Sequence, residues 1–595
     1  YNLYGSAFKE KGNFDRAIDA FNESIKLDGN NFVPFLNKGI LYYNSKNYNN
    51  AKKNLQESLK INPENFFGNF VMASVLQHSI ENLSIDQHED VLNSSIEFYE
   101  KAQKLDPTFL NLYSNYGNVL MLIGELKKAK LIFLQGLKIE PHNSILTYNL
   151  ANLYEREKDY DKAISFFSKT IKNNPKFYQA HNNLATLLLK HKKKYNLSLY
   201  HYNQAISLNR DSDYLSNKAS LLEEMGELGS AFTAINESLK INNKNSKAYY
   251  NKGKILERMG EIKSAVTAYE KSIEIDPDFV DAKWNKGVNN LLLENFSEGW
   301  KYYEVRKRRP SWVRRVFKGK ELTQLSELNG RSILLYSEQG LGDTIQFLRF
   351  ASQLVSIANK VIVEVQKPIK NILSEIPHVE IVSKDDQLTE TDYHFPLMSL
   401  PRLLKITKDN ITSPVDLKLN NKIIKRWQKK INKNFFNVGV AWLGSKTHED
   451  DNHILKYRRS FSPNYFRYFE DIPNIKLLSL QKDDDLSGNE KKGIPENIHL
   501  FNNFDNHDEA FLDTISLIKN LDLVISCDTS IAHIAGSLNC PVWVPLKMVP
   551  DWRWMLKTSK TPYYPSMKLY RQEEWGNWDF VFKNMREDIL NINKS

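Results

Sequence analysis

Small side chains recur at a fixed interval through the first half of the chain. The interval is 34 residues, except for one step of 44 residues between Ala73 and Gly117. The recurring positions are Gly5, Gly39, Ala73, Gly117, Ala151, Ala185, Ala219, Gly253 and Gly287. A constant period of this length predicts a repeat architecture, because units that cannot bury an apolar face alone must stack on their neighbours.

Most units carry a second small residue and then a larger apolar one, which predicts a pair of antiparallel helices. The second small residue comes twelve positions after the first, and a large aromatic or aliphatic residue follows four positions later. The pairs are Ala17 and Phe21, Ala51 and Leu55, Ala129 and Phe133, Ala163 and Phe167, Ala231 and Ile235, and Ala265 and Tyr269. Proline closes five units, at Pro63, Pro107, Pro141, Pro175 and Pro277, and stops the second helix.

This pattern resembles the tetratricopeptide repeat (TPR) family. The resemblance implies an α-solenoid over residues 1–309, a TPR superhelix of about nine repeats with a concave groove. We expect the longer step to give a lengthened helix pair or a loop near Glu81–Asp90. The irregular last unit, Trp284 to Arg306, should cap the array and join the next domain. Such arrays also allow a homo-oligomer formed through the repeats.

Asparagine occupies one position of the first helix in most repeats, two residues before the small side chain. The predicted peptide-binding positions are Asn115, Asn149, Asn183, Asn217, Asn251 and Asn285, and Asn37 shares the pattern. An amide can pair with both the N–H and the C=O of a peptide backbone, so stacked asparagines can hold an extended polypeptide. The row resembles the asparagine ladder of protein O-GlcNAc transferases. The alternative is that these asparagines only support helix packing.

The second half of the chain alternates short apolar runs with helical stretches, which is typical of an α/β fold. Strands are predicted at Ser332–Ser337, Lys360–Gln366, Phe436–Trp442, Ile475–Gln481, Leu523–Asp528 and Val542–Leu546. Helices are predicted at Thr344–Asn359, Asp513–Leu521 and Thr529–Leu538. The proposed division is a basic linker at 310–330, an acceptor-side Rossmann-like domain at 331–430 and a donor-binding one at 431–595. Two such domains leave a cleft between them.

Composition and charge are those of an ordinary globular protein. The 595 residues include 81 basic and 71 acidic side chains, a net charge of +10, which we interpret as a solvated surface and not as a nucleic-acid site. No apolar run is long enough for a membrane span. The two cysteines, Cys527 and Cys540, show no disulfide or metal-binding spacing. We expect two reduced core thiols and a cytoplasmic protein.

A glycine-rich turn follows the first predicted strand of the α/β region. Gly340 and Gly342 allow a tight turn, and Asp343 falls at the start of the next helix. A full dinucleotide-binding fingerprint would place a third glycine where the chain has Ile345, so NAD binding is not predicted. Asp343 can cap the helix or act as a general base facing the cleft.

A second strand-to-helix turn carries Asp528, Thr529 and Ser530, with His533 on the helix that follows. The free N–H groups and positive dipole end at such a turn suit a diphosphate. The alternative is that Thr529 and Ser530 cap the helix and His533 is structural.

Together these segments resemble the heptosyltransferase-like glycosyltransferases, and more fully the bacterial proteins that fuse TPRs to such a module. The shared segments are Glu338–Asp343, Val440–Gly444, Asp528–His533, Pro541–Trp543, Pro550–Trp554, Tyr564–Pro565 and Arg571–Gln572. The resemblance implies a GT-B fold of two Rossmann-like domains, a nucleotide-diphosphate sugar as co-substrate, no metal or other cofactor, and inversion at the anomeric carbon. It makes Asp343 the candidate general base.

The candidate donor-binding residues are Gly340, Gly342, Trp442, Arg459, Asp528, Thr529, Ser530, His533 and Asp551. Arg458 or Arg459 can give the leaving diphosphate a bidentate partner, or can face solvent. Trp552 and Trp554 can stack on a base or sugar, or belong to the core. The chain departs from the family at Ser445, where asparagine is common. The acidic runs Glu449–Asp451 and Asp483–Asp485 are interpreted as solvated loops.

These observations favour a glycosyltransferase that moves a sugar from a nucleotide donor to a Ser or Thr hydroxyl of a polypeptide in the TPR groove. Two alternatives are a transferase acting on a glycan or lipid-linked saccharide, and a TPR scaffold without catalysis. The presence of both Asp343 and the Asp528–His533 segment favours an enzyme over a scaffold.

Overall fold

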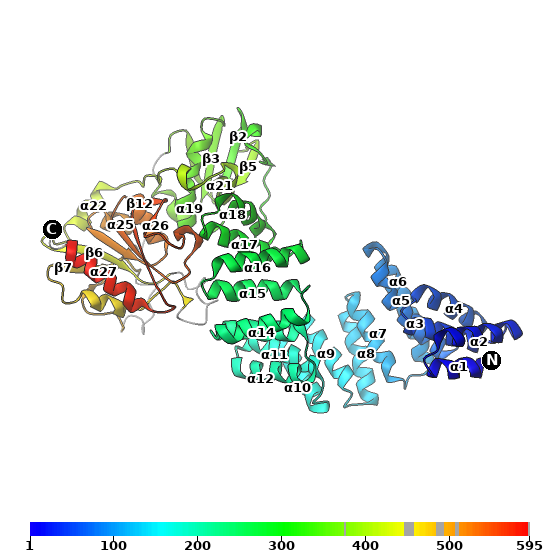
Figure 1. Cartoon of the computed structure of the whole chain (residues 1–595). Coiled ribbons are helices and arrows are strands. Elements are labelled where there is room, and N and C mark those ends of the chain that lie inside the picture. The colour runs from blue at the N-terminus through cyan, green and yellow to red at the C-terminus, as the bar shows by residue number, and fades with distance from the viewer. Residues whose placement is uncertain (374–375, 445–456, 483–492, 506–510, 593–595) are drawn as a thin grey trace. The chain divides into compact units, whose positions relative to one another are not determined.

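The computed structural model describes residues 1–373, 376–444, 457–482, 493–505 and 511–592 (Figure 1). It divides into two compact units, Tyr1–Leu221 and Leu222–Ser595, which are described separately below. This division differs from the domain boundary expected at residue 309, because the last repeats pack with the α/β region.

The first unit is built from successive pairs of helices. They are α1 (Asn2–Glu10), α2 (Phe14–Leu27), α3 (Phe32–Asn44), α4 (Tyr48–Ile61), α5 (Phe66–Ser79), α6 (His88–Leu105), α7 (Leu110–Leu122), α8 (Leu126–Ile139), α9 (Ser144–Arg156), α10 (Tyr160–Asn173), α11 (Tyr178–Lys192), α12 (Tyr195–Leu208) and the first part of α13 (Ser212–Glu224). The longer step forms two 3-10 turns, Ile80–Asn82 and Ile85–Gln87, ahead of the 18-residue helix α6. The predicted lengthened helix pair is therefore confirmed.

Glycines in the first helices give room for the large side chains of the second helices. A Cβ built on Gly5 would lie 2.4 Å from the Phe21 ring, and one built on Gly117 would lie 2.2 Å from the Phe133 ring. Each ring therefore occupies the space that a larger residue would need, which explains the sixteen-residue spacing of these pairs. Helix α8 ends at Ile139, two residues before Pro141, as the proline pattern predicts.

The second unit begins with the remaining repeat helices. They are the end of α13, α14 (Leu228–Ile241), α15 (Ser246–Arg258), α16 (Ile262–Ile275), α17 (Val280–Leu292) and α18 (Phe296–Tyr303), followed by the 3-10 helix η3 (Glu304–Arg308). Trp300 of α18 is buried, and its indole N–H donates to the Ile406 carbonyl at 3.1 Å. The last unit therefore caps the array and packs onto the next domain, as predicted.

A five-stranded parallel sheet follows the repeats. Its strands are β1 (Lys320–Glu321), β2 (Ser332–Tyr336), β3 (Lys360–Val365), β4 (Val379–Ser383) and β5 (Tyr393–Pro396), in the order β1-β5-β2-β3-β4. The predictions for β2 and β3 are confirmed, whereas β1 lies in the segment expected to be an irregular linker. The helix predicted at 344–359 begins earlier, as α19 (Leu341–Phe347), and continues as the 3-10 helix η5 (Leu348–Leu354).

A seven-stranded sheet forms the C-terminal part. Its strands are β6 (Phe436–Ala441), β7 (Ile475–Ser479), β8 (Ile498–His499), β9 (Leu523–Ser526), β10 (Val542–Leu546), β11 (Lys560–Thr561) and β12 (Tyr564–Arg571). The order is β11-β12-β10-β9-β6-β7-β8, and all neighbours are parallel except β11 and β12. The predicted strands β6, β7, β9 and β10 are confirmed. With the first sheet, this gives the predicted α/β region of two parallel sheets.

Helices cover and connect these two sheets. They are α20 (Lys367–Lys370), α21 (Leu400–Leu403), α22 (Asn421–Gln428), α25 (Leu512–Ile518), α26 (Ser530–Ser537) and α27 (Trp578–Ile592). Short 3-10 helices lie at η4 (Leu325–Leu328), η6 (Leu397–Ser399), η7 (Lys408–Asn410), η9 (Pro463–Phe469) and η11 (Trp552–Trp554). The helices predicted before and after β9 correspond to α25 and α26.

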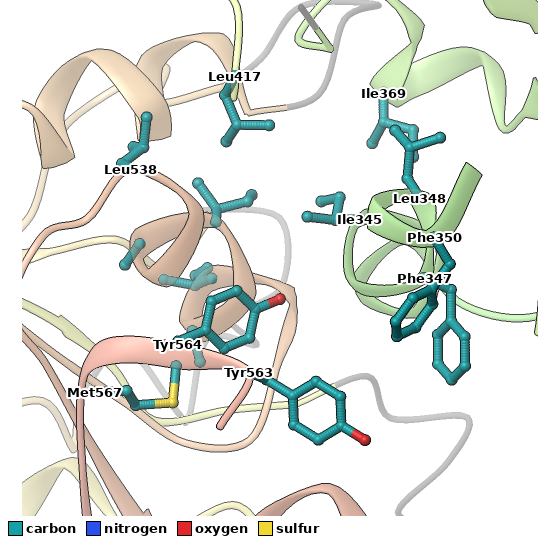
Figure 2. Packing of buried hydrophobic residues seen from close by; sticks show 14 of the residues in the cluster. Ile345, Phe347, Leu348, Phe350, Ile369, Leu417, Leu538, Tyr563, Tyr564 and Met567 are labelled. Atoms are coloured by element: carbon teal, nitrogen blue, oxygen red, sulfur yellow. The ribbon is translucent and has the colours of Figure 1, made fainter. Parts of the chain in front are cut away.

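One apolar core joins the repeat cap to both sheets. Trp300 packs edge-on against Trp552, with ring centroids 5.2 Å apart. Figure 2 shows Ile345 of α19 on one side and Tyr564 of β12 on the other side of the contact between the two α/β parts. Burial of this shared surface holds the two sheets together. The residues at the junction of the two sheets are therefore held by a well-packed apolar core.

The predicted state of the cysteines is confirmed, since Cys527 and Cys540 are both buried thiols that form no disulfide within the described residues. Burial raises the pKa of the Cys540 thiol to about 12. Within the described ranges, no helix combines the length and the apolarity that crossing a bilayer would require.

Candidate functional site

Two strand-to-helix turns meet where the two sheets face each other. Helix α19 follows β2 of the first sheet, and α26 follows β9 of the second. A Cβ built on Gly342 would lie 2.9 Å from His533 Cδ2 and 3.3 Å from Ser530 Cα. Gly342 therefore lets the first turn of α19 approach the first turn of α26, which is a physical reason for glycine at this position. The structure thus brings together two segments singled out from the sequence.

Asp343 lies in the first turn of α19 and is held from two sides. Its Oδ2 accepts a hydrogen bond from the Gly340 N–H at 3.0 Å, so it does cap the helix, as one of the two interpretations predicts. Its Oδ1 forms an ion pair with the Arg553 guanidinium. The side chain is still 20% exposed. Because each carboxylate oxygen has two lone pairs, these contacts leave Asp343 able to accept a further proton donor.

Arg553 links the two sheets through this carboxylate. Its Nη1 donates to Asp551 Oδ1 at 2.8 Å, and its Nε donates to Gln346 Oε1 at 2.7 Å. Burial lowers the pKa of Arg553, but the Asp551 and Asp343 carboxylates outweigh burial and raise the pKa above its ordinary value. The arginine is therefore a fixed cation. The sequence does not single out Arg553, although it lies in the Pro550–Trp554 segment, because nothing local to that segment marks its partner Asp343.

His533 is buried beside this network and is neutral. Its Nδ1 lies 3.0 Å from the Tyr564 hydroxyl, and its ring stacks on Trp554 with centroids 5.5 Å apart. Burial, and then the nearby Arg553 and Arg349 cations, hold the pKa of His533 well below its usual range. A neutral imidazole with one nitrogen bound to Tyr564 is a hydrogen-bonding group of fixed orientation.

Asp528 and Thr529 follow β9 after the single residue Cys527 and are half-buried. Burial, followed by the Asp551 carboxylate, raises the pKa of Asp528, while Arg459 opposes that shift. Arg459 thus lies within electrostatic reach of the predicted donor segment. Thr529 is the N-cap residue of α26, but its side chain makes no capping bond, and its Oγ1 instead shares a 3.2 Å hydrogen bond with Ser526 Oγ. The capping alternative therefore fails for Thr529.

Three tryptophans belong to the core. Trp442, predicted to contact the donor, is only 1% exposed and packs edge-on against Phe466. Its side chain cannot contact a ligand in this arrangement, and this prediction is corrected. Trp552 packs among Trp300 and its neighbours, and Trp554 is fully buried beneath His533. Their role here is packing and not stacking on a base.

A cavity of about 210 Å³ lies between the last repeats and the loop that follows β10. The repeat side includes Asn285, the last of the asparagine positions, and the other side includes Lys547. Lys547 comes directly after β10, at the same end of the sheet as Asp528. The sequence analysis did not identify Lys547.

The asparagines of the repeats bond to the neighbouring repeat. Hydrogen bonds run from Asn37 to Asn2 (3.2 Å), Asn149 to Ser114 (3.0 Å), Asn183 to Tyr148 (3.2 Å), Asn217 to Asn182 (3.1 Å) and Asn285 to Tyr269 (3.2 Å). Asn115 contacts Tyr99, and Asn251 is buried. In each of these five bonds the asparagine Nδ2 donates. The asparagines therefore do support helix packing. An amide also has a second N–H and a carbonyl, so this packing role does not exclude peptide binding.

Among the residues that the structure describes, no group of three His, Cys, Asp or Glu side chains is placed to hold a metal ion. The acidic runs Glu449–Asp451 and Asp483–Asp485 lie outside the described residues, as does Ser445.

Comparison with known proteins identifies the repeats. Family models described as tetratricopeptide repeat match residues 246–279 and residues 1–31, 35–65, 110–143 and 147–177. The N-terminal region of about 300 residues is therefore a TPR solenoid.

Curated relatives match the TPR part at low identity. A TPR repeat-containing protein of Methanocaldococcus jannaschii is 22% identical over 41% of this chain and 50% of its own length. The human protein O-mannosyl-transferase TMTC3 is 25% identical over 32% of this chain and 21% of its own. SPINDLY of Hordeum vulgare, named a probable UDP-N-acetylglucosamine–peptide N-acetylglucosaminyltransferase, is 22% identical over 29% of this chain and 18% of its own. The chain thus spans a half or less of these relatives, two of which are named as transferases.

Proposed function

We propose that this chain is a glycosyltransferase that moves a sugar from a nucleotide-diphosphate donor to a Ser or Thr hydroxyl of a polypeptide. The observation that carries the proposal is the meeting of the α19 and α26 turns. Gly342, the residue before Asp343, lies against Ser530 and His533 of a helix that begins shortly after a parallel strand. Such helix ends in open α/β sheets suit phosphate groups. The transferase names of two distant TPR relatives are consistent with this function.

In the proposed reaction, the acceptor oxygen attacks the anomeric carbon while the bond from that carbon to the diphosphate oxygen breaks. Asp343 accepts the proton of the acceptor hydroxyl as the new bond forms. The negative charge that develops on the leaving diphosphate is stabilised by backbone N–H groups at the start of α26 and by Arg459. Arg553 keeps the Asp343 carboxylate oriented toward the junction.

The proposed acceptor is a polypeptide held in the TPR groove by the asparagine positions. Each amide that donates an N–H to the neighbouring repeat is held in a fixed orientation. A row of oriented amides can bind an extended backbone with little regard for its sequence. Asn285 belongs to this row and also lines the cavity next to Lys547.

The test is sugar transfer by the full chain, from labelled UDP, GDP, ADP and CMP sugars to a mixture of Ser- and Thr-containing peptides. Asp343→Asn should lower transfer by about a hundredfold or more, because the amide cannot take the proton. Asp386→Asn is the matched control, since Asp386 pairs with Lys370 at 2.6 Å near β4 of the first sheet and should leave transfer unchanged. Equal transfer by Asp343→Asn and the wild type would refute the proposed base.

The acceptor class is tested by replacing Asn149, Asn183 and Asn217 together with alanine. Transfer to long polypeptides should fall, whereas transfer to short acceptors should remain. Asn54→Ala is the control, because the Asn54 amide lies on a helix surface and donates to the Asn50 carbonyl of the same helix. Thermal unfolding must accompany the assay, because the bonds to the neighbouring repeats are also lost. Unchanged transfer to both acceptor sizes would favour a glycan or lipid-linked acceptor.

A further inference from the structure

The cavity between the last repeats and the β10 loop is lined by charged groups. Its lining residues are Glu223, Lys254, Glu257, Arg258, Asn285, Lys547, Val549 and Trp575. They come from α13, α15 and α17 on the repeat side, and from the segments after β10 and β12 on the other side. The Trp575 indole N–H donates to the Arg258 carbonyl at 2.6 Å, which ties the two sides together.

Both acidic residues of the lining are already engaged by other groups. Glu223 is buried and lies 3.0 Å from Lys254 Nζ and 2.8 Å from Arg258 Nε. Glu257 accepts hydrogen bonds from the Tyr269 hydroxyl at 3.0 Å and from the Asn289 amide at 2.8 Å. Two carboxylates therefore face three cations in the lining, and both have partners before any ligand arrives.

Among the described residues that line the cavity, Lys547 is the cation for which no such partner is present. Within the described part of the chain, no residue forms an ion pair or a hydrogen bond with its ammonium group. Burial, and then the neighbouring Arg258, lower the pKa of Lys547, although Asp551 and Asp528 partly oppose the shift. A partly buried ammonium group without a counter-ion is costly, and a bound carboxylate would relieve that cost.

The size and position of the cavity indicate what kind of anion it takes. About 210 Å³ is below the range of pockets that enclose a whole small-molecule ligand, so it suits a side chain better than a nucleotide. Asn285, from the row that we assign to the acceptor polypeptide, is part of its lining. A polypeptide that reaches Asn285 would therefore place its next side chains at this cavity.

We propose that the cavity binds an acidic side chain of the acceptor polypeptide, whose carboxylate pairs with Lys547 and Arg258. The chain would then prefer acceptors with Asp or Glu near the modified Ser or Thr. This inference rests on the proposed function, and it adds a specificity-determining residue, Lys547, to it.

The test is peptide binding to the full chain without any nucleotide sugar. The probes are pairs of short Ser- or Thr-containing peptides that differ only by Asp against Asn, or Glu against Gln, at one position. The wild type should bind the acidic member of some pairs about tenfold more tightly, and added salt should reduce this difference. Lys547→Met should remove the preference and Lys547→Glu should reverse it. Lys557→Met, an exposed lysine in the same segment, should keep it.

The outcomes separate this inference from the proposed function. Equal binding of both members of every pair by the wild type overturns the acidic preference but leaves the transferase proposal standing. A preference that survives in Lys547→Met overturns the role of Lys547. Weaker binding of UDP, GDP, ADP or CMP by Lys547→Met, with the peptide preference intact, would assign Lys547 to the donor instead. If no peptide binds at all, the polypeptide acceptor itself is wrong.

Discussion

Arg553 determines how Asp343 is presented at the junction of the two sheets. The guanidinium contacts carboxylates on both sides of the junction, Asp343 and Asp551, and also the Gln346 amide. It stacks 4.4 Å from the centroid of the Trp552 ring, which restricts its movement. A general base must be placed within hydrogen-bond distance of the proton that it removes. The ion pair supplies that placement from residues far apart in the chain.

Replacing Gly342 tests whether the approach of α19 to α26 builds the site. A Cβ on Gly342 would collide with the His533 ring and with backbone at Ser530, so Gly342→Ala should destabilise the second unit by about 1–3 kcal/mol. Gly340→Ala is the control, because its nearest neighbour is Asp343 Oδ2 at 3.3 Å and its φ of −67° suits any residue. Denaturant unfolding measures both variants. If the two variants are equally stable, α19 and α26 are not packed closely at Gly342.

The sequence indicated the two turns but not the residues that connect them. Gly342, Asp343 and His533 could be named because glycine, acid and histidine sit beside predicted strand ends. Arg553 could not be paired with Asp343, since 210 residues separate them and only the packing of the two sheets brings them together. Trp442 was misassigned because an aromatic residue after a strand looks the same in sequence whether it lines a site or the core.

At the level of elements, the repeat helices are fixed by the fit of rings into glycine positions. A Cβ on Gly253 would lie 2.4 Å from the Tyr269 ring, which is fully buried. The Tyr269 hydroxyl donates to Glu257 and accepts from Asn285. The same ring therefore packs one repeat and orients the asparagine that lines the cavity.

Gly253→Ala should lower the stability of the second unit by about 1–3 kcal/mol, although alanine is the better helix former. Gly229→Ala in α14 is the matched control, because a Cβ there meets nothing within 4 Å. That variant should be neutral or more stable by up to about 1 kcal/mol. Thermal unfolding of the two variants decides the point. A Gly253→Ala protein as stable as the wild type would contradict the packing described for this repeat.

A pair of histidines makes the first unit sensitive to acid. His181 Nδ1 and His201 Nδ1 lie 2.9 Å apart on α11 and α12. Burial, and then the His181 charge, lower the pKa of His201 from 6.5 to about 4. Between these two pH values the unfolded chain binds a proton at His201 that the folded chain does not. The free energy of unfolding is therefore highest above pH 6.5 and falls toward pH 4.

The histidine prediction is checked by denaturant unfolding at several pH values in this window. His201→Gln should show a smaller loss of stability between pH 6.5 and about 4 than the wild type, because a titrating group has been removed. If the free energy of unfolding depends on pH identically in the wild type and in His201→Gln, the pKa of His201 is not lowered in the folded chain.

Elements with a strong pattern were predictable and short or mixed ones were not. The apolar runs of β2, β3 and β10 are buried almost throughout, and their bounds match the prediction closely. Strand β12 was missed because it contains Pro565 and Lys568 and alternates buried with exposed residues. Strand β1 has two exposed residues and exists only by pairing with β5, so no local pattern marks it.

At the scale of the whole molecule, the last repeats and the α/β region form one compact unit. Arg306, at the end of the repeats, forms a buried bidentate ion pair with Glu338, just before the glycine turn. Arg306 also donates to the Ser399 hydroxyl at 2.7 Å. Removing one partner of a buried ion pair lowers the stability of the protein, because the other charge is left buried without a counter-ion. The end of the repeats is thus coupled to the segment that carries Asp343.

Because of this contact, the last repeats and the proposed catalytic site belong to one compact unit. The same unit holds Asn251, Asn285, the cavity at Lys547, and the Asp343 and Asp528 turns. An acceptor bound to the last repeats would therefore stand in a defined position relative to the proposed catalytic base. The sequence predicted that the last repeat joins the next domain, but it did not indicate that the helices from the end of α13 to α18 form one compact unit with the α/β region.

We propose that the junction of the two sheets binds and turns over a nucleotide sugar. The direct measurement is calorimetric binding of UDP-, GDP-, ADP- and CMP-sugars to the full chain, followed by nucleotide release with the wild type and Asp343→Asn. We predict saturable binding of one donor by both proteins and turnover by the wild type alone. If no donor binds, even with cell lysate present as acceptor, the proposed glycosyltransferase function is wrong and the chain is a TPR scaffold.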